Sequence, residues 1–342
     1  MWGNQKPWGK QVRNMKPIKC LLLIALSICV LTLMSCESKP AQKQPIRIAI
    51  NVWPGYAYAY LAQGKGIFKK NNVEVELILK ESTPESLKLF TNGEVDGCFH
   101  ILSDIIMLNA SGIPARIVCL VDFSTIGDVI IGQPEIQLLA ALKGKTVSFE
   151  GVNTFSHIFV LNALEKAGVY EQNVRFENID AHDVLAALDE KRIYAGHTWE
   201  PTKSQTLKKG YKILATAGDY PGIITDVLTF TPQMIKERPD EIRIIIKSLF
   251  EARDYLNSHK DEALTIMADK MGMSKEEMAT GLEGLSHVDL KENLELMTST
   301  NSSLYTSGQR IIDFYYKRGQ LSHNMDIKGI LEPEFIEDLA PK

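Results

Sequence analysis

Short runs of alternating hydrophobic and polar residues begin at residue 46 and recur along the chain. Ile46, Ile48 and Ile50, for example, are separated by Arg47 and Ala49, which is the period of a strand with one buried face. The runs that predict strands are residues 46–52, 73–79, 96–101, 117–121, 146–150, 174–179, 193–195, 211–215 and 223–230. The segments between them that have helical spacing or helix-capping residues are residues 56–70, 82–93, 104–110, 155–167, 182–188 and 201–209.

The regular succession of strand and helix predicts an α/β fold built on parallel sheets with right-handed crossovers. A break at Gly132-Gln133-Pro134 predicts that a second lobe starts there. From residue 232 onward the pattern is helical, and we expect this helical C-terminal region to pack on the first lobe, so that the chain crosses between the lobes twice. The predicted boundaries are residues 46–131 plus 228–342 for lobe 1 and residues 132–227 for lobe 2.

The first 35 residues have the pattern of a bacterial lipoprotein signal peptide. Lys16 and Lys19 precede an apolar run over residues 20–33, which ends in Leu33-Met34-Ser35-Cys36. The pattern predicts cleavage before Cys36 and attachment of a lipid to it, with the polar residues 36–45 as a tether. A membrane-spanning anchor is the alternative, although the run is shorter than the ~18–20 apolar residues that a spanning helix needs. We expect an extracytoplasmic protein that is lipid-anchored to the bacterial membrane, in the periplasm or on the outer face.

Met15 gives this signal ordinary proportions, which favours it over Met1 as the start of the protein. Residues 1–35 contain basic but no acidic residues, so their removal makes the net charge of −4 more negative. No basic surface is therefore left to predict binding to nucleic acid. Cys98 and Cys119 lie in apolar strands and are interpreted as buried thiols, with a disulfide as the alternative.

Known catalytic and metal-binding patterns are absent from the sequence. The seven histidines have no partner at metal-ligand spacing. The chain also lacks a Gly-x-Ser-x-Gly elbow, a P-loop, a His-Glu-x-x-His motif and a dinucleotide glycine fingerprint. We therefore predict no metal, no cofactor and no catalytic residues.

Ligands of open α/β sheets bind at the carboxyl ends of strands, where helix N-termini point their free N–H groups. Applied to the predicted strands, this rule selects residues that follow a strand or open a helix. They are Trp53, Tyr56, Ser103, Asn153, Thr154, Trp199, Glu200 and Asp226. Trp53 and Trp199 follow strands in different lobes, and two such side chains can hold a flat or apolar ligand between them.

Each of these residues also has a purely structural interpretation. A tryptophan at a strand end can be a core residue, and Thr154 can be a plain helix cap. Glu200 and Asp226 can be exposed carboxylates, or buried acids that accept hydrogen bonds from a ligand amine. We expect the second role because no basic side chain stands in the same turns and a buried carboxylate needs a partner.

Several short segments together resemble the nitrate/sulfonate/taurine/thiamine-precursor group of solute-binding lipoproteins of ABC importers. These segments are residues 48–56, which include Trp53-Pro54-Gly55-Tyr56, and residues 61–68, 92–97, 142–147, 195–201 and 223–227. They extend over about residues 46–230, and the helical tail is similar only in character. The resemblance implies a two-lobed periplasmic-binding-protein fold of type II, with two crossings, whose lobes close by a hinge on a small-molecule solute.

The resemblance also implies the partners and the ligand positions. The partners are an ABC permease and its ATPase, and the membrane through the N-terminal lipid, while the protein is expected to be a monomer. The implied ligand contacts are the Trp53 turn, Ser103, the Asn153–Thr154 turn, Trp199-Glu200 and Asp226. No Arg or Lys stands at these turns to neutralise an inorganic anion, so a sulfonate, taurine or a thiamine-pyrimidine-like solute is expected rather than nitrate.

Two other functions occur on the same fold. One is a pyrimidine-precursor synthase-like enzyme, which uses a Cys-rich segment and a histidine. This chain has no cysteine cluster and no cytoplasmic address. The other is a ligand-sensing input protein, which would carry a second membrane segment and a signalling module. Neither feature is visible in this sequence, so the transport function is preferred.

Overall fold

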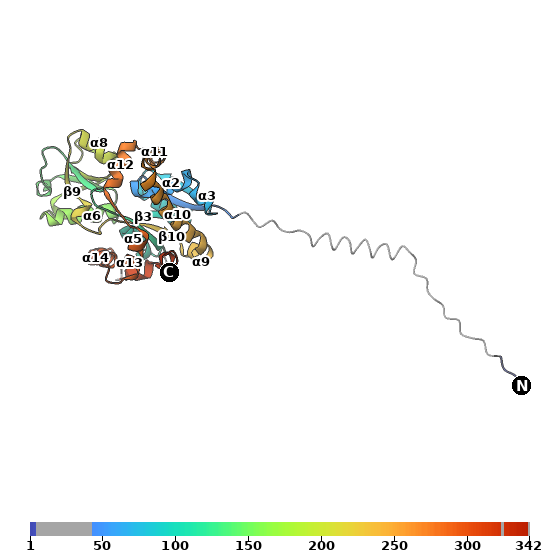
Figure 1. Cartoon of the computed structure of the whole chain (residues 1–342). Helices are drawn as coiled ribbons and strands as arrows, with labels where there is room; N and C mark the ends of the chain where they lie inside the picture. Colours follow the sequence, from blue (N-terminus) through green and yellow to red (C-terminus); the bar gives the residue numbers. More distant parts are fainter. Residues whose placement is uncertain (5–42, 323–324, 341–342) are drawn as a thin grey trace. The chain divides into compact units, whose positions relative to one another are not determined.

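The computed structural model describes residues 1–4, 43–322 and 325–340 (Figure 1). The chain divides into two units, residues 1–44 and residues 45–342, and the second unit holds all helices and strands reported below. The predicted signal peptide and the lipid attachment site Cys36 lie outside the described residues, apart from residues 1–4. No helix within the described ranges is long and apolar enough to cross a membrane.

The first sheet has six strands in the order β11-β4-β10-β3-β1-β2. Their bounds are Ile46–Asn51 (β1), Val75–Lys80 (β2), Gly97–Ile101 (β3), Arg116–Ser124 (β4), Thr225–Phe230 (β10) and Leu285–His287 (β11). Strand β1 is parallel to β2 and β3, as predicted, but β10 is antiparallel to both of its neighbours, β3 and β4. The chain leaves β4 at its carboxyl end and returns over the same edge, so β10 begins there and runs in the opposite direction.

The second sheet has five strands in the order β7-β6-β8-β5-β9. Their bounds are Val129–Gly132 (β5), Thr146–Phe149 (β6), Arg175–Asn178 (β7), Ala195–Thr198 (β8) and Lys212–Thr216 (β9). Strand β5, which is antiparallel to β8 and β9, was not predicted because Val129-Ile130-Ile131 is a fully buried run without polar alternation. The prediction of parallel sheets is therefore wrong for the strand that enters each sheet from the other one, and also for β11, which is antiparallel to β4.

We call the part of the chain around the six-stranded sheet lobe 1 and the part around the five-stranded sheet lobe 2. The chain passes from lobe 1 to lobe 2 between β4 and β5, and returns between β9 and β10. The lobe boundaries expected from the sequence, after residues 131 and 227, fall inside β5 and β10. Asp128 lies in the first crossing, and Asp226 lies at the start of β10, just after the second crossing.

Helices cover both sheets and carry the turns that face the other lobe. In the first part of the chain they are α2 (Ala57–Gly64), α3 (Ile67–Lys70), α4 (Thr83–Thr91), α5 (Leu102–Ala110), α6 (Phe155–Lys166), α7 (Val184–Asp189) and α8 (Thr202–Lys208). Short 3-10 turns are η1 (Pro54–Tyr56), η2 (Leu139–Leu142), η3 (Glu171–Asn173), η4 (Ala181–Asp183), η5 (Ala217–Asp219) and η6 (Ile327–Ile330). Helix α5 begins at Leu102, two residues before the predicted start at residue 104, and Ile101 occupies its cap position. Ser103 therefore lies inside the helix and does not cap it.

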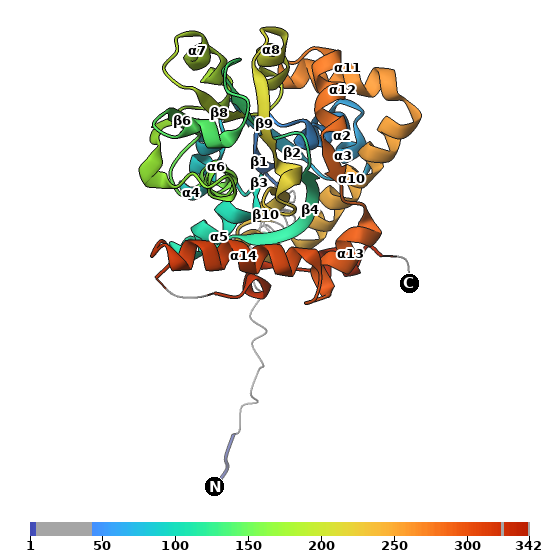
Figure 2. The same cartoon turned by 90° about the vertical axis from the view of Figure 1, so that its left-hand side faces the viewer.

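The helical C-terminal region packs mainly on lobe 1, as predicted. Its helices are α9 (Pro232–Glu237), α10 (Pro239–Ser258), α11 (Lys260–Met271), α12 (Lys275–Glu283), α13 (Leu290–Thr298), α14 (Ser303–Lys317) and α15 (Glu334–Glu337). Helices α10 and α11 pack against α2, and α14 packs against α5 (Figure 2). The hydroxyl of Tyr315 on α14 donates to the carbonyl of Thr154, 3.2 Å away in lobe 2, a link across the lobes that the sequence pattern did not indicate.

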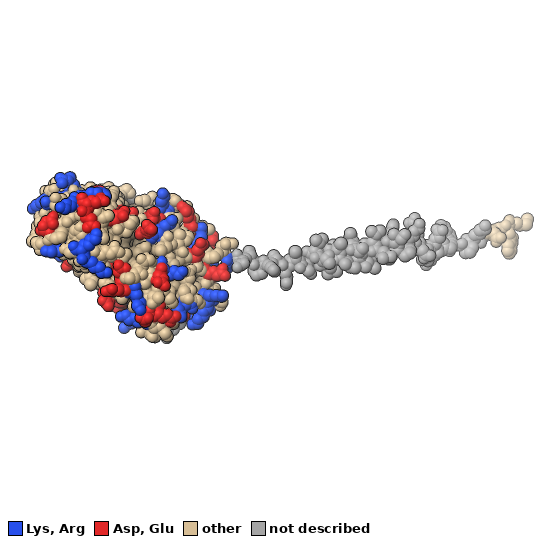
Figure 3. All heavy atoms as spheres, turned by 90° about the horizontal axis from the view of Figure 1, so that it is seen from above, with Lys and Arg blue, Asp and Glu red and all other residues tan. Residues whose placement is uncertain are grey.

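Two further predictions concern cysteines and metals. Cys98 and Cys119 are both buried and both free, which confirms the interpretation as buried thiols. Within residues 43–322 and 325–340 no group of three or more metal-ligating side chains is positioned to hold a metal ion. On the face shown in Figure 3, basic and acidic side chains are interspersed over the globular part and form no extended patch of one sign.

Candidate functional site

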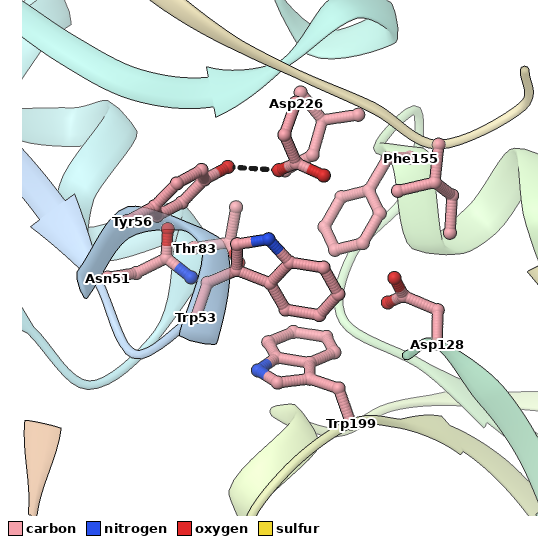
Figure 4. A pocket seen from close by; sticks show the side chains of 10 residues that line it. Asn51, Trp53, Tyr56, Thr83, Asp128, Phe155, Trp199 and Asp226 are labelled. Atoms are coloured by element: carbon pink, nitrogen blue, oxygen red, sulfur yellow. Dashed lines mark hydrogen bonds between the residues drawn. The ribbon is translucent and has the colours of Figure 1, made fainter. Parts of the chain in front are cut away.

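A small cavity lies between the carboxyl edge of the first sheet and the facing turns of lobe 2 (Figure 4). We call it the deep cavity. Its lining comes from both lobes and both crossings, and consists of Asn51, Trp53, Tyr56, Thr83, Ile101, Asp128, Phe155, Trp199, Ile224 and Asp226. The free volume is about 10 Å³, which is room for about one water molecule. Four of the eight predicted ligand residues, Trp53, Tyr56, Trp199 and Asp226, are in this lining.

Trp53 and Trp199 meet at the centre of the deep cavity. Their ring centroids are 6.3 Å apart with the planes at 80°, an edge-to-face arrangement. Trp199 also donates its indole N–H to the carbonyl of Val52, 2.9 Å away in lobe 1. The prediction that the two tryptophans face each other across the lobes agrees with this geometry. Because the rings touch, a solute larger than water can enter between them only when the lobes separate.

Two aspartates lie directly opposite each other on the lobe 1 side of the cavity. Asp226 on β10 and Asp122 on β4 are partners in the strand register, and both are fully buried. The hydroxyl of Tyr56 donates to Asp226, and the indole N–H of Trp53 donates to Asp122 Oδ2 at 3.4 Å. Burial and the facing Asp122 carboxylate raise the pKa of Asp226 well above its usual range.

The pKa of Asp122 is also raised, to about 7, and burial is again the largest cause. Near neutral pH the two carboxyl groups therefore hold at least one proton between them. Asp226 Oδ2 and Asp122 Oδ1 have no hydrogen-bond partner among the described residues. Of the two acids, Asp226 lines the cavity and Asp122 does not, and the proton that the pair holds can bridge the two carboxyl groups.

A third carboxylate, Asp128, reaches the cavity from the first crossing. His197 Nε2 lies 2.9 Å from Asp128 Oδ1, and His197 Nδ1 lies 2.7 Å from the hydroxyl of Ser156. That hydroxyl also accepts the backbone N–H of Glu150. A neutral imidazole that donates its Nε2–H to Asp128 presents Nδ1 as the acceptor for the Ser156 hydroxyl. Asp128 Oδ2 remains without a hydrogen-bond partner among the described residues. Asp128 belongs to neither a predicted strand nor a predicted helix start, so no pattern in the sequence indicated its role.

The Ser156–His197–Asp128 chain contains the residue types of a hydrolytic triad. Ser156 is fully buried and lines neither the deep cavity nor the pocket beside it, so no substrate can reach its hydroxyl in this conformation. The chain instead connects α6, β8 and the first crossing and fixes the orientation of the Asp128 carboxylate. We therefore interpret these residues as positioning groups and not as nucleophile and base.

Glu200 does not line the cavity, although the sequence predicts it as a ligand residue. Its carboxylate lies 3.1 Å from the ammonium of Lys203, and both side chains are buried. It also accepts the backbone N–H of Ser204. Lys203 stands three residues later on the same helix start, a spacing at which opposite charges pair, so this partner was detectable in the sequence. With its charge neutralised, Glu200 has no need of a ligand amine.

The other predicted residues serve as supports near the cavity. Ser103 is fully buried and lies 3.3 Å from Asp104 Oδ1. The Asn153 side chain is hydrogen-bonded to Gln320, near the C-terminal end of α14. Thr154 caps α6 as the sequence predicts, accepting the N–H of His157. Thr154 lines a neighbouring pocket and not the deep cavity.

Asp104 makes a hydrogen bond across the lobes that the sequence did not predict. Its Oδ1 accepts the backbone N–H of Phe155 at 2.7 Å. Phe155 is the first residue of α6, so a carboxylate of lobe 1 occupies the positive end of a helix of lobe 2. Burial raises the pKa of Asp104 to about 7. The hydrogen bond between Asp104 and Phe155, which joins the lobes, is therefore coupled to the protonation of Asp104.

Comparison with known proteins is consistent with this architecture. The sequence model of the family described as NMT1/THI5 like matches residues 53–263. The chain belongs to this family. It is 25% identical over 298 residues to a Brucella abortus protein named a binding protein, covering 84% of this chain and 90% of that one. It is 25% identical over 235 residues to a protein of Haemophilus influenzae named for thiamine biosynthesis, covering 68% and 74%.

Solved structures show the same fold. The alkanesulfonate-binding protein of Xanthomonas axonopodis pv. citri, solved bound to MOPS, superposes with a TM-score of 0.71 at 16% identity. The superposition covers 85% of this chain and 99% of that one. The family-model match and this superposition confirm the predicted family and the predicted two-lobed periplasmic-binding-protein fold.

Proposed function

We propose that this protein is an extracytoplasmic solute-binding protein that captures a small organic solute between its lobes and delivers it to an ABC permease and its ATPase. One observation carries the proposal. The deep cavity is lined from both lobes, at the two crossings where a hinge motion opens and closes it. The binding protein of Brucella and the alkanesulfonate-binding protein, which are similar to this chain over most of its length, support a binding role.

The chemistry of the lining favours an organic solute with a hydrogen-bond-donating nitrogen. The lining includes the carboxyl groups of Asp128 and Asp226 and no Lys, Arg or His. A bare inorganic anion such as nitrate would meet two carboxyl groups there and no positively charged side chain. A taurine-like sulfonate or a thiamine-pyrimidine-like compound can offer a nitrogen to the carboxylates and apolar surface to Trp53 and Trp199. The names of the relatives, alkanesulfonate-binding and thiamine biosynthesis, agree with these two classes.

A thermal-shift screen of the full chain tests the proposal. A ligand that binds only the folded state at about 100 times its Kd adds about 2.7 kcal/mol to the free energy of unfolding. We expect taurine, an alkanesulfonate or an aminopyrimidine to raise the melting temperature, and nitrate, the matched anionic control, to leave it unchanged. Small-angle scattering should then show a smaller radius of gyration with the bound solute. Stabilisation by nitrate alone, or an unchanged scattering profile with a tight-binding solute, contradicts the proposal.

We further propose that Cys36 is the lipidated N-terminus of the mature protein and its membrane attachment. The support is the Leu-Met-Ser-Cys motif after a short apolar run. We expect the Cys36→Ser protein to be released in soluble form or to remain unprocessed. Mass spectrometry of the native N-terminal peptide provides the direct measurement. An uncut and unmodified Cys36 in the native protein contradicts the anchor and leaves the binding function untouched.

A further inference from the structure

A second pocket opens beside the deep cavity, at the side of the interface away from the crossings. We call it the outer pocket. It lies between α4 and the β3–α5 turn of lobe 1 and the end of β6 with the start of α6 in lobe 2. Its lining residues are Thr83, Pro84, Leu87, Lys88, Thr91, His100, Asp104, Glu150, Thr154 and Phe155. Thr83 and Phe155 belong to both linings, so the two spaces adjoin.

The outer pocket is much larger than the deep cavity. Its volume is about 250 Å³, against about 10 Å³ for the deep cavity. A water molecule has a share of about 30 Å³ in the liquid, so the outer pocket can hold several waters or one small organic group. A solute bound between Trp53 and Trp199 can therefore extend into the outer pocket.

Glu150 is the chemically unusual group in the outer pocket. Its side chain is 5% exposed. The hydroxyl and N–H of Thr83 and the N–H of Ala181 lie close to its carboxylate, but no hydrogen bond of regular geometry joins either oxygen to a described residue. Its backbone is held firmly, because its N–H donates to the hydroxyl of Ser156 at 2.9 Å. A buried carboxylate without a partner is costly for a fold. Burial accordingly raises the pKa of Glu150 to about 8.

The other charged and titratable lining residues of the outer pocket do not pair with Glu150. Asp104 already accepts the N–H of Phe155, and His100 Nδ1 lies 3.4 Å from the second oxygen of Asp104. His100 Nε2 has no hydrogen-bond partner among the described residues, and burial lowers the pKa of this histidine to about 4, so it is neutral. Lys88, the lining residue with a permanent positive charge, is on an exposed position of α4.

We propose that the outer pocket is a subsite of the solute site, in which Glu150 binds a positively charged, hydrogen-bond-donating nitrogen of the solute. This inference rests on the proposed function. A protonated amine supplies both the charge and the hydrogen bonds that the Glu150 carboxylate lacks. The aromatic residues of the deep cavity hold the flat or apolar part of the same solute. The sequence predicts this role for Glu200, but Glu200 is paired with Lys203 in the structure. Glu150 takes the role instead.

Matched amine and hydroxyl compounds test the subsite by titration calorimetry on the full chain. One pair is taurine and isethionate, and the other is the 5-aminomethyl and 5-hydroxymethyl forms of 4-amino-2-methylpyrimidine. Within each pair the compounds differ in whether they carry an ammonium or a hydroxyl group. We expect the unmodified protein to bind the amine of at least one pair about ten- to a hundredfold more tightly than its hydroxyl counterpart, the range for a charge-assisted hydrogen bond.

The variant Glu150→Gln keeps the shape of the side chain and cannot ionise. We expect it to lose the amine preference and to bind the hydroxyl compound about as tightly as the unmodified protein, which also shows that the variant folds. Asp180→Asn is the matched control, because Asp180 acts electrostatically on Glu150 but does not line the pocket. It should keep the preference.

The outcomes separate this inference from the proposed function. Equal affinity of the unmodified protein for amine and hydroxyl, or an amine preference that survives in Glu150→Gln, overturns the subsite and leaves solute capture standing. The subsite is also overturned if Asp180→Asn loses the amine preference to the same extent as Glu150→Gln. The preference would then come from the overall negative charge near the outer pocket and not from Glu150. If none of the four compounds binds the unmodified protein, both the proposed solute classes and the subsite are wrong.

Discussion

Trp199→Ala is expected to weaken solute binding by about ten- to a hundredfold and to shift the protein toward a more open form. The indole of Trp199 contacts Trp53 across the lobes and donates to the carbonyl of Val52 at 2.9 Å. An aromatic pair contributes about 0.5–1.5 kcal/mol beyond its buried area, and a hydrogen bond about as much again. Both interactions exist only when the lobes are in contact, so their loss lowers the stability of the closed form specifically.

Small-angle scattering and calorimetry separate this effect from general destabilisation. We expect a larger radius of gyration for Trp199→Ala than for the unmodified protein, with and without solute. The control is Trp199→Phe, which keeps an aromatic ring against Trp53 and removes the donor to Val52, and its effect should be the smaller of the two. If Trp199→Ala binds solute as tightly as the unmodified protein and has the same scattering profile, the tryptophan pair does not act in closure.

The free energy of unfolding is expected to fall as the pH rises above about 6.5. Below that pH the histidines His100, His157 and His287, whose pKa values burial lowers to about 4, act in the opposite direction to the buried acids. The folded protein holds a proton on Asp122 up to a pKa of about 7, because of burial first of all, while the unfolded chain loses that proton near pH 4. Between these values Asp122 is protonated in the folded state and ionised in the unfolded state, so its contribution to stability falls with pH, by about 1.4 kcal/mol per pH unit. Asp226 and Asp104 act in the same direction.

Asp122→Asn should flatten this dependence. It removes one titrating group and, at the same time, the carboxylate that raises the pKa of Asp226. Denaturant unfolding between pH 5 and pH 8 provides the slope, and the variant should differ from the unmodified protein most at the alkaline end. Glu135→Gln, at an exposed position, is the control for removing a carboxylate. A slope in Asp122→Asn equal to that of the unmodified protein would show that the aspartate pair is ionised in the fold.

The sequence by itself determined the elements of this protein and the general location of its site. Alternation with period two, as at residues 46–52, depends on which face of a strand is buried and is visible locally. Thr154 was identifiable as a cap because a helix start needs a side-chain acceptor in the chain just before it. Trp53, Tyr56, Trp199 and Asp226, which the sequence predicts as ligand residues, line the deep cavity, since the carboxyl ends of strands in both lobes face the space between them.

The tertiary structure alone decided which of these groups are free to bind. Asp226 stands opposite Asp122 because β10 lies next to β4, a strand order that no local pattern encodes. Asp128 reaches the cavity from a crossing without regular structure. Glu150 is left without a hydrogen bond of regular geometry among the described residues, whereas Glu200, also a glutamate shortly after a strand end, is paired with Lys203. The charge state of a buried carboxylate depends on all the groups around it in space, and only the folded chain brings those groups together.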